Sequence, residues 1–273
     1  MTRRIDSPTF FVDAHVHMGY YPRFGCKEPF YYSPRRVFGV LARCGISEFI
    51  VSTTNSQLAC ITLNDIIREA REMRRIAGAM AHQLLWVSGR ILDEDPLLAS
   101  LDASVRPRGR CSDGEIRLYE GVKLHGVETP WMTSRKSDLR RVLDAAAERN
   151  MVVQIHTADD FCCHPHGWGR YAQLYPSVMM DFSHCKPMVD TMEVMRTCPN
   201  VYTDISFLGH SEVDYLLKSD VSDRVMFGSD LPAYHAFCSG TMTSCYRKRV
   251  SEYCRSEMDK MAHACKSFLT GAV

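Results

Sequence analysis

The sequence predicts an α/β protein that folds as a single (β/α)8 barrel of the TIM type, extending over residues 1–273 as one domain. Eight short apolar runs rich in Val, Ile and Phe alternate with segments of helical period, which is typical of βαβ units and a parallel sheet. Such a barrel takes about 250 residues. A doubly wound open sheet is the alternative, but no Gly-x-Gly-x-x-Gly motif follows the first run.

The predicted strands are the apolar runs themselves, each followed by polar or turn residues. They are Phe10–His17, Glu48–Ser52, Leu84–Ser88, Gly121–His125, Val152–His156, Val178–Ser183, Val201–Ile205 and Val225–Ser229.

The predicted helices are placed by the residues at their ends. Ser33 and Pro34 supply an N-cap and a first-turn proline before the helix Arg35–Cys44, and Gly45 ends it. Thr62–Met80 is a long helix with an apolar stripe. The other predicted helices are Pro96–Leu101, Leu139–Arg149, Pro187–Arg196 and Glu212–Leu217, and Thr243–Leu269 is the last helical region. Residues 159–166 are predicted to be a solvent-facing loop, with a second metal-binding pair at His164 and His166 as the alternative.

Composition and charge exclude some classes of function. The chain has 33 basic and 32 acidic residues, so it lacks the one-sided positive charge of a nucleic-acid binder. Its first residues lack the apolar core of a signal peptide, and no apolar run approaches the roughly 18 residues of a membrane span. We therefore expect a cytoplasmic protein that acts on a small molecule, with a homodimer as the alternative to a monomer.

The first predicted strand carries two histidines, His15 and His17, at alternate positions. Because alternate side chains of a strand point the same way, the two imidazoles share a face with Asp13. Neutral imidazole is a common ligand of divalent metals, so this face can hold an ion. A pair of hydrogen-bonded histidines without a metal is the alternative interpretation of this segment alone.

Polar residues follow several of the other predicted strands. Lys123 and His125 end the fourth strand, His156 ends the fifth, His184 follows the sixth and Asp230 follows the eighth. In a (β/α)8 barrel the carboxyl ends of the strands surround the mouth, where the chemistry takes place. The sequence therefore predicts a metal site built from five strands at one end of the barrel.

These motifs together resemble the amidohydrolase superfamily, and more narrowly its amidohydrolase-related branch of lactonases and nonoxidative decarboxylases. The most specific single match is Phe-Gly-Ser-Asp-x-Pro at 227–232, preceded by Asn-Val-Tyr-Thr-Asp-Ile-Ser at 200–206. The resemblance extends from Phe10 to Pro232. It implies that the metal-site residues are His15, His17, His156, His184 and Asp230.

The resemblance also implies the roles of two residues. Asp230 would bind the ion and take a proton from the attacking water, because a divalent ion lowers the pKa of the water that it binds. In family members with one metal the sixth-strand histidine acts as acid or base, so His184 is a ligand or a proton carrier. The branch has Gly-Gly after this histidine, whereas this chain has Cys185, Lys186 and Pro187, which alters the pocket near a second metal.

Lys123 has two interpretations. In two-metal members of the superfamily a lysine at the end of the fourth strand is carbamylated and bridges the ions. An unmodified ammonium would instead repel the ions and bind a substrate carboxylate.

Three residues are predicted to bind substrate. His125 lies just beyond the fourth strand, Tyr234 lies just after Asp230, and Arg23 belongs to an aromatic and basic loop, Met18–Ser33, that follows the first strand. These residues would suit an anionic ring or lactone. A packed hydrophobic loop is the alternative interpretation of Met18–Ser33, and a loop histidine without a role is that of His125.

The predicted function is that of a metal-dependent hydrolase that uses one or two divalent ions to cleave an ester, lactone or amide of a small organic substrate. Zinc is the expected ion, with manganese, iron, nickel and cobalt as alternatives. Three other functions remain open. One is a nonoxidative decarboxylase of a small aromatic or unsaturated carboxylic acid, another is a phosphoesterase or deoxyribonuclease, and the last is a catalytically silent metal-binding barrel.

Overall fold

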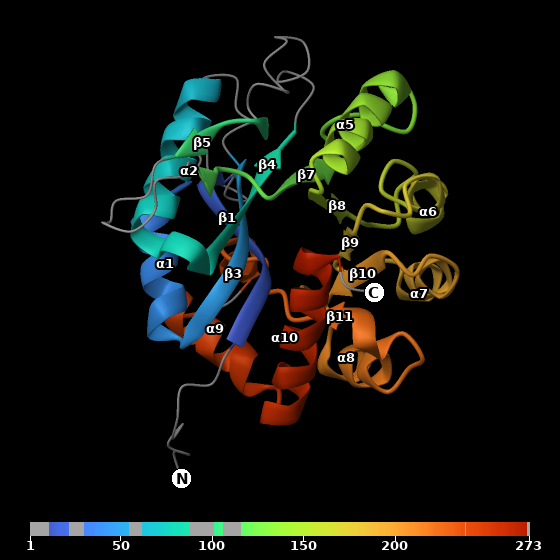
Figure 1. The fold of residues 1–273 in the computed structure, drawn as a ribbon. Coiled ribbons are helices and arrows are strands. Elements are labelled where there is room, and N and C mark those ends of the chain that lie inside the picture. Colours follow the sequence, from blue (N-terminus) through green and yellow to red (C-terminus); the bar gives the residue numbers. More distant parts are fainter. Residues whose placement is uncertain are drawn as a thin grey trace.

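Parallel strands form a curled sheet in the computed structural model, and helices cover its outer side (Figure 1). The structure describes residues 11–21, 30–54, 62–87, 101–105, 116–237 and 239–271. The main sheet has nine strands in the order β11-β10-β9-β8-β7-β4-β3-β1-β2. They are β1 (Phe11–Tyr21), β2 (Phe30–Tyr32), β3 (Ile46–Thr53), β4 (Ala81–Trp86), β7 (Gly121–His125), β8 (Val152–His156), β9 (Met180–Ser183), β10 (Val201–Asp204) and β11 (Val225–Met226). A separate two-stranded sheet pairs β5 (Ser104–Val105) with β6 (Ile116–Arg117).

Each of the eight predicted strands has a counterpart in the main sheet, and these eight pair in parallel. The prediction did not include β2, which pairs antiparallel with the end of β1. The last predicted strand is shorter than expected, because β11 contains only Val225 and Met226. The α/β class and the parallel, chain-ordered sheet are therefore as predicted.

The helices are α1 (Pro34–Arg43), α2 (Leu63–Ala77), α5 (Lys136–Glu148), α6 (Pro165–Leu174), α7 (Met188–Thr197), α8 (His210–Leu217), α9 (Met242–Ser251) and α10 (Arg255–Thr270), with short 3-10 helices at Gly78–Met80, Ser222–Arg224 and Ala233–Phe237. The predicted start of α1 is confirmed, since the Ser33 side chain accepts a hydrogen bond from the Arg36 N–H. Gly45 follows the helix with φ of 80°, a conformation that favours glycine. Within the described residues, no helix is long and apolar enough to cross a membrane. The predicted helix Pro96–Leu101 lies almost entirely outside the described residues.

One helix was missed by the prediction. Helix α6 was not predicted, because Gly167 and Gly169 lower its intrinsic helix propensity. Gly169 has a packing role, since a Cβ at this position would lie 3.0 Å from the side chain of Val194 on α7. The predicted helical region Thr243–Leu269 is confirmed, and it is divided into α9 and α10. The Glu257 side chain accepts a hydrogen bond from the Cys254 N–H and so caps the start of α10.

The two ends of the parallel sheet are joined by backbone hydrogen bonds. The Ala14 N–H donates to the Phe227 carbonyl at 2.7 Å, and the His17 N–H donates to the Leu231 carbonyl at 2.6 Å. Between them, the Asp230 N–H donates to the His15 carbonyl at 2.8 Å. These bonds fix the segment after β11 alongside β1.

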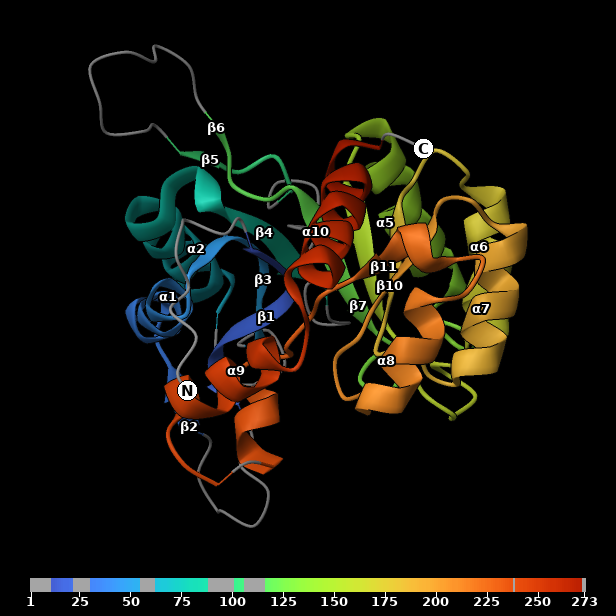
Figure 2. The ribbon, with the colours of Figure 1, turned by 90° about the horizontal axis from the view of Figure 1, so that it is seen from below.

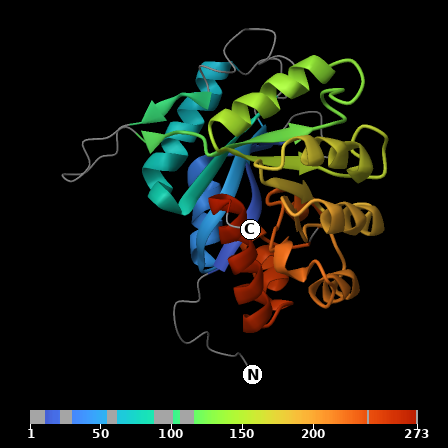
Figure 3. The ribbon, with the colours of Figure 1, turned by 45° about the vertical axis from the view of Figure 1, so that its right-hand side comes forward.

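Apolar side chains from several strands gather in a second cluster, apart from the main core, and α10 packs against it. The strands contribute Val12, Ala14, Ile50, Leu84, Val152, Tyr202 and Met226, with Met179 from just before β9, and α10 contributes Ala262, Ala264, Cys265 and Phe268. Figures 1 and 2 show α10 beside β1 and β11, and Figure 3 shows the other helices arranged around the outside of the sheet. Helix α10 therefore supports the sheet from the side that carries this apolar cluster.

A group of charged residues lies near the amino ends of the strands. His82 at the start of β4 hydrogen-bonds through Nδ1 to Glu120, and Glu120 also accepts from Arg74 at 2.7 Å. Burial alone would lower the pKa of His82, but the hydrogen bond and the charge of Glu120 outweigh it and the pKa is raised. The contribution of this group to the stability of the fold therefore depends on whether His82 is protonated.

We expect His82→Gln to destabilise the protein by about 1 kcal/mol at pH 6 and by less at pH 9. Because the folded-state pKa of His82 is raised, its contribution is complete below the unfolded value of about 6.5 and disappears as the pH rises through the folded value. Urea unfolding at the two pH values checks this, with His263→Gln on the exposed side of α10 as the control. An equal loss of stability at both pH values would contradict the prediction.

Candidate metal centre

The residues predicted to lie at the strand ends come together at the carboxyl end of the sheet. His15 and His17 lie in β1, Lys123 lies in β7 and His156 lies at the end of β8. His184 directly follows β9, and Asp230 lies shortly after β11. His15, His17, Lys123, His184 and Asp230 are each at most 4% exposed, and His156 is partly buried. This is the end at which βα loops surround the active site in barrels of parallel strands.

The prediction that Asp13 shares a face with the two histidines was wrong. The pairing of β1 with β3 shifts by one residue between Asp13 and Val16, which is the effect of a β-bulge. His15 and His17 consequently point toward each other, whereas Asp13 accepts a hydrogen bond of 2.6 Å from the Tyr246 hydroxyl on α9. Asp13 therefore anchors β1 and does not join the metal centre.

Four non-glycine residues around this centre have left-handed backbone conformations. They are His184, Cys185, Phe207 and Asp230, with φ between 48° and 75°. Such conformations cost about 1–3 kcal/mol each and concentrate at functional sites, where the surrounding structure imposes them. Two of the four are residues that the sequence assigns to the chemistry.

His15, His17 and Asp230 bring three ligand atoms together. His17 Nε2 lies 3.0 Å from His15 Nε2 and 3.1 Å from Asp230 Oδ1, and His15 Nε2 lies 3.8 Å from Asp230 Oδ1. Ligand atoms of a tetrahedral zinc with bonds of about 2.0–2.1 Å lie roughly 3.3 Å apart, so the three separations suit one ion. Asp230 Oδ1 is buried and accepts no hydrogen bond within the described part of the chain. The residues present therefore fit a divalent cation.

The protonation of the buried histidines also suits metal binding. Burial holds the pKa of His15, His156 and His184 well below the usual value, and the positive charge of Lys123 acts in the same direction. These imidazoles are therefore neutral at physiological pH. Neutral imidazole is the form that binds a metal.

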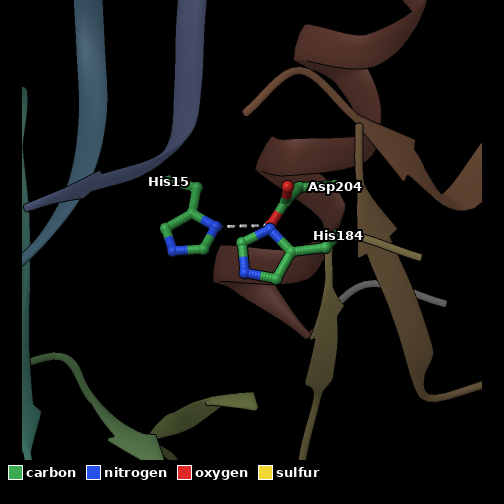
Figure 4. Close-up of side chains that lie close together, drawn as sticks. All are labelled: His15, His184 and Asp204. Atoms are coloured by element: carbon green, nitrogen blue, oxygen red, sulfur yellow. Dashed lines mark hydrogen bonds and ion pairs between the residues drawn. The ribbon is translucent and has the colours of Figure 1, made fainter. Parts of the chain in front are cut away.

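His156 and His184 form a second part of the centre. His184 Nε2 lies 3.0 Å from His156 Nδ1, and His184 joins His15 and Asp204 in a further group of three potential ligands (Figure 4). His156 belongs to neither of the buried groups whose ligand atoms all lie within 4.8 Å. The structure thus brings together all the predicted histidine ligands, with His156 at the edge.

Lys123 lies in contact with the metal centre. It is 1% exposed, and its Nζ lies 3.3 Å from His15 Nε2 and donates to Ser183 Oγ at 3.1 Å. The Ser183 hydroxyl in turn donates to Asp181 Oδ2 at 3.2 Å. Burial lowers the pKa of Lys123, and nearby carboxylates, Asp181 first among them, oppose this shift.

Two of the three predicted substrate-binding residues lie near the centre. His125 is stacked between His156 and Trp86, with ring centroids 4.0 Å and 5.9 Å away. The Tyr234 ring lies 6.2 Å from that of Phe207, which is 5.6 Å from His184. Arg23, the third, falls in residues 22–29, outside the described residues.

Sequence reasoning gave no role to several residues that contact the predicted ligands. Asp204 and Ser206 contact His15 and His184, Ser52 lies 2.8 Å from His17 Nδ1, and the Trp86 ring lies 5.1 Å from that of His17. Asp204 and Ser206 belong to the motif at 200–206, which supports the family resemblance but assigns no role to either residue. Since Asp204 ends a strand as the ligands do, its position was the available signal.

A third group of potential ligands lies at the surface. His166 Nε2 is 3.3 Å from Glu193 Oε2 and 3.9 Å from Asp190 Oδ1, and His164 Nε2 is 3.5 Å from Asp190 Oδ2. Each of these four side chains is at least 29% exposed. We interpret them as surface ion pairs between α6 and α7.

Comparisons with known proteins find one matching family model and several similar solved structures. A family model described as amidohydrolase matches residues 12–236. A probable 2-pyrone-4,6-dicarboxylic acid hydrolase from Acinetobacter baumannii has a similar structure, with 12% identity, 96% of this chain and 99% of that chain covered, and a TM-score of 0.62. A comparison with curated protein sequences finds no match.

Two further solved structures are similar. A β-aspartyl dipeptidase from Fervidobacterium islandicum is 11% identical, with 96% of this chain and 74% of that chain covered and a TM-score of 0.65. A 5-carboxyvanillate decarboxylase from Sphingomonas paucimobilis is 9% identical, with 96% and 98% covered and a TM-score of 0.57. At such identities these likenesses show a shared fold.

We expect chelator-treated protein to bind added Zn²⁺ or Co²⁺ and to become more stable. An ion at 100 times its dissociation constant adds about 2.7 kcal/mol to the free energy of unfolding. Thermal unfolding and elemental analysis against protein concentration check this and give the stoichiometry. Two ions per chain would support a carbamylated Lys123, and one would support an unmodified lysine.

The chain offers a matched control for this measurement. The double variant His15→Ala/His17→Ala should lose the tightly bound ion, whereas His164→Ala/His166→Ala has the same spacing at the surface and should keep it. A protein that takes up no ion, or that loses it only in the surface variant, would refute the assignment of the centre.

Proposed function

Because this chain belongs to the amidohydrolase family, we propose that it is a metal-dependent hydrolase that cleaves an ester, lactone or amide bond of a small organic substrate. The fold proposed for it is a closed (β/α)8 barrel. Support for closure comes from the hydrogen bonds between β1 and residues 227–231, and from the parallel bridge between Val16 and Leu231.

The proposed metal ligands are His15, His17 and Asp230, and His156, His184 and Lys123 complete the surroundings of the ion. Zinc is the expected ion, since two imidazoles and one carboxylate oxygen are ligands that it commonly takes. When bound, a divalent ion lowers the pKa of a water molecule and polarises the carbonyl of the substrate.

The proton transfers are assigned to two residues of the chain. Asp230 Oδ1 is buried and accepts no hydrogen bond within the described residues, so it is available to take the proton of the attacking water. His184 is kept neutral by burial and lies within the same centre, so its unprotonated nitrogen can accept the proton that Asp230 takes from water and pass it to the leaving oxygen or nitrogen. Water then supplies one hydrogen to the leaving group and its hydroxyl to the acyl carbon.

One observation carries the proposal. A buried carboxylate oxygen, Asp230 Oδ1, lies within 4 Å of the Nε2 atoms of His15 and His17, and burial holds the pKa of His15 well below its usual value. Most buried carboxylate oxygens accept a hydrogen bond, whereas Asp230 Oδ1 accepts none within the described residues and faces two imidazole nitrogens. The arrangement is instead one that is completed by a cation and a water molecule.

A nonoxidative decarboxylase is the second candidate function. The observation that favours it is Lys123, whose buried amine in contact with His15 suits the carboxylate of a substrate. In this reaction the bond to the carboxyl carbon breaks, carbon dioxide leaves, and a proton replaces it on the substrate.

We expect Asp230→Asn to lower kcat/KM for hydrolysis by a factor of about 10²–10⁴, the typical contribution of a general base. The amide oxygen of asparagine still offers a ligand atom, so elemental analysis should find the ion retained, with lower affinity. The measurement uses a panel of lactones, esters and amides. Asp220→Asn, which removes an exposed partner of Arg196, is the control.

The same panel, run in ¹⁸O-labelled water, separates the candidate functions. Incorporation of one labelled oxygen into the product supports the hydrolase. Release of carbon dioxide without labelled product from carboxylated substrates would replace it with the decarboxylase. A metal-loaded protein that turns over neither class, and whose biological role survives Asp230→Asn, would identify a silent metal-binding barrel.

A further inference from the structure

We propose that Asp204 and Ser206, at the end of β10, are positioning residues that hold His15, His184 and His156 in the tautomer with the proton on Nδ1. The effect on metal binding rests on the proposed function, whereas the tautomers themselves do not. A buried chain of hydrogen bonds joins His156, His184, Ser206, Asp204 and His15, and each donor in it has a single hydrogen to give.

The first step concerns Ser206, whose hydroxyl has a single hydrogen to donate. Its Oγ donates to Asp204 Oδ1 and also lies 2.6 Å from His184 Nδ1. Because a carboxylate can only accept, the hydrogen of the hydroxyl is committed to Asp204. Ser206 must therefore accept from His184, and His184 Nδ1 carries the proton.

The second step extends the chain to β8. With its proton on Nδ1, a neutral His184 has only a lone pair on Nε2, and this atom lies 3.0 Å from His156 Nδ1. His156 must then donate, so its own proton is also on Nδ1. Protons thus point in one direction, from His156 through His184 and Ser206 to Asp204.

The third step concerns the opposite oxygen of the same carboxylate. Asp204 Oδ2 lies 2.8 Å from His15 Nδ1, and both side chains are fully buried (Figure 4). His15 Nδ1 therefore donates to Asp204, and His15 Nε2 is left with a lone pair directed at His17 Nε2, 3.0 Å away. A metal at the centre requires this lone pair, and a partner that fixes the imidazole typically accounts for 10–100-fold in metal affinity.

A glycine at position 228 leaves room for the Asp204 carboxylate. A Cβ at Gly228 would lie 2.7 Å from Asp204 Oδ1 and 2.8 Å from its Cβ, so only glycine fits there. The Ser206 N–H donates to Asp204 Oδ1 at 2.8 Å. Two motifs that are separate in sequence, 200–206 and 227–232, therefore meet at one side chain.

The first test is a long-range ¹H–¹⁵N correlation spectrum of the chelator-treated protein with ¹⁵N-labelled histidine. His15→Gln, His184→Gln and His156→Gln assign the signals. We expect all three histidines to show a protonated Nδ1 and an unprotonated Nε2. A proton on Nε2 of His15 or His184 in the unmodified protein would overturn the proposal, whether or not any variant folds.

The second test compares Asp204→Asn with Ser206→Ala. Asp204→Asn should populate the other tautomer of His15 and weaken Zn²⁺ or Co²⁺ binding 10–100-fold in a chelator competition. Ser206→Ala should change the tautomers of His184 and His156 and leave that of His15 unchanged. Unchanged spectra and affinities in both variants would overturn the proposal.

A matched control separates positioning from loss of stability. Asp181 is another fully buried carboxylate, but its partners are Gln154 and Ser183 and not a histidine. Asp181→Asn should therefore leave the three tautomers unchanged, and a tautomer change there equal to that of Asp204→Asn would refute the assignment. If the predicted tautomers are found in a protein that binds no ion, the proposed function fails and the positioning role stands.

Discussion

The candidate centre depends on backbone hydrogen bonds that join the first strand to the segment after the last one. The His15 carbonyl accepts from the Asp230 N–H, and the His17 N–H donates to the Leu231 carbonyl. Residues that are more than 200 positions apart in the sequence are thereby held next to each other. Because these bonds are between main-chain atoms, they fix the position of Asp230 relative to both histidines whatever the loops contain. The loops can then set specificity while the metal centre stays the same.

Several features close to these hydrogen bonds lower the stability of the folded protein. Left-handed non-glycine residues, neutral buried histidines, a buried lysine and several buried carboxylates lie at one end of the sheet. Burying polar groups is tolerated only where each finds a partner, and most of these do so through Ser52, Ser183, Ser206 and Gln154. Asp230 Oδ1 accepts no hydrogen bond within the described residues and lies within 4 Å of two imidazole nitrogens, which is why the proposed chemistry is assigned to it. The opposite, apolar part of the sheet interior is packed by α10 and supplies the compensating stability.

Much of this arrangement could be predicted from the sequence because it follows simple periodicities. Alternation of apolar runs and helices located the strands, and the rule that chemistry lies at their carboxyl ends located His15, His17, His156, His184 and Asp230. The bulge in β1 could not be read from the sequence, since nothing in the alternation of Asp13, His15 and His17 indicates the extra residue. Asp204 was missed because its role lies in a contact with a histidine 189 positions away. Helix α6 was missed because its glycines are there for packing and weaken the local signal.

The most direct test of the account is the position of a bound ion in crystals grown with zinc, measured by anomalous diffraction at the zinc absorption edge. We expect the strongest peak within about 2.0–2.2 Å of one nitrogen each of His15 and His17 and of Asp230 Oδ1. A strongest peak at His166, Asp190 and Glu193, with none at these three residues, would contradict the account. The absence of any zinc peak between His15, His17 and Asp230 would also contradict the account.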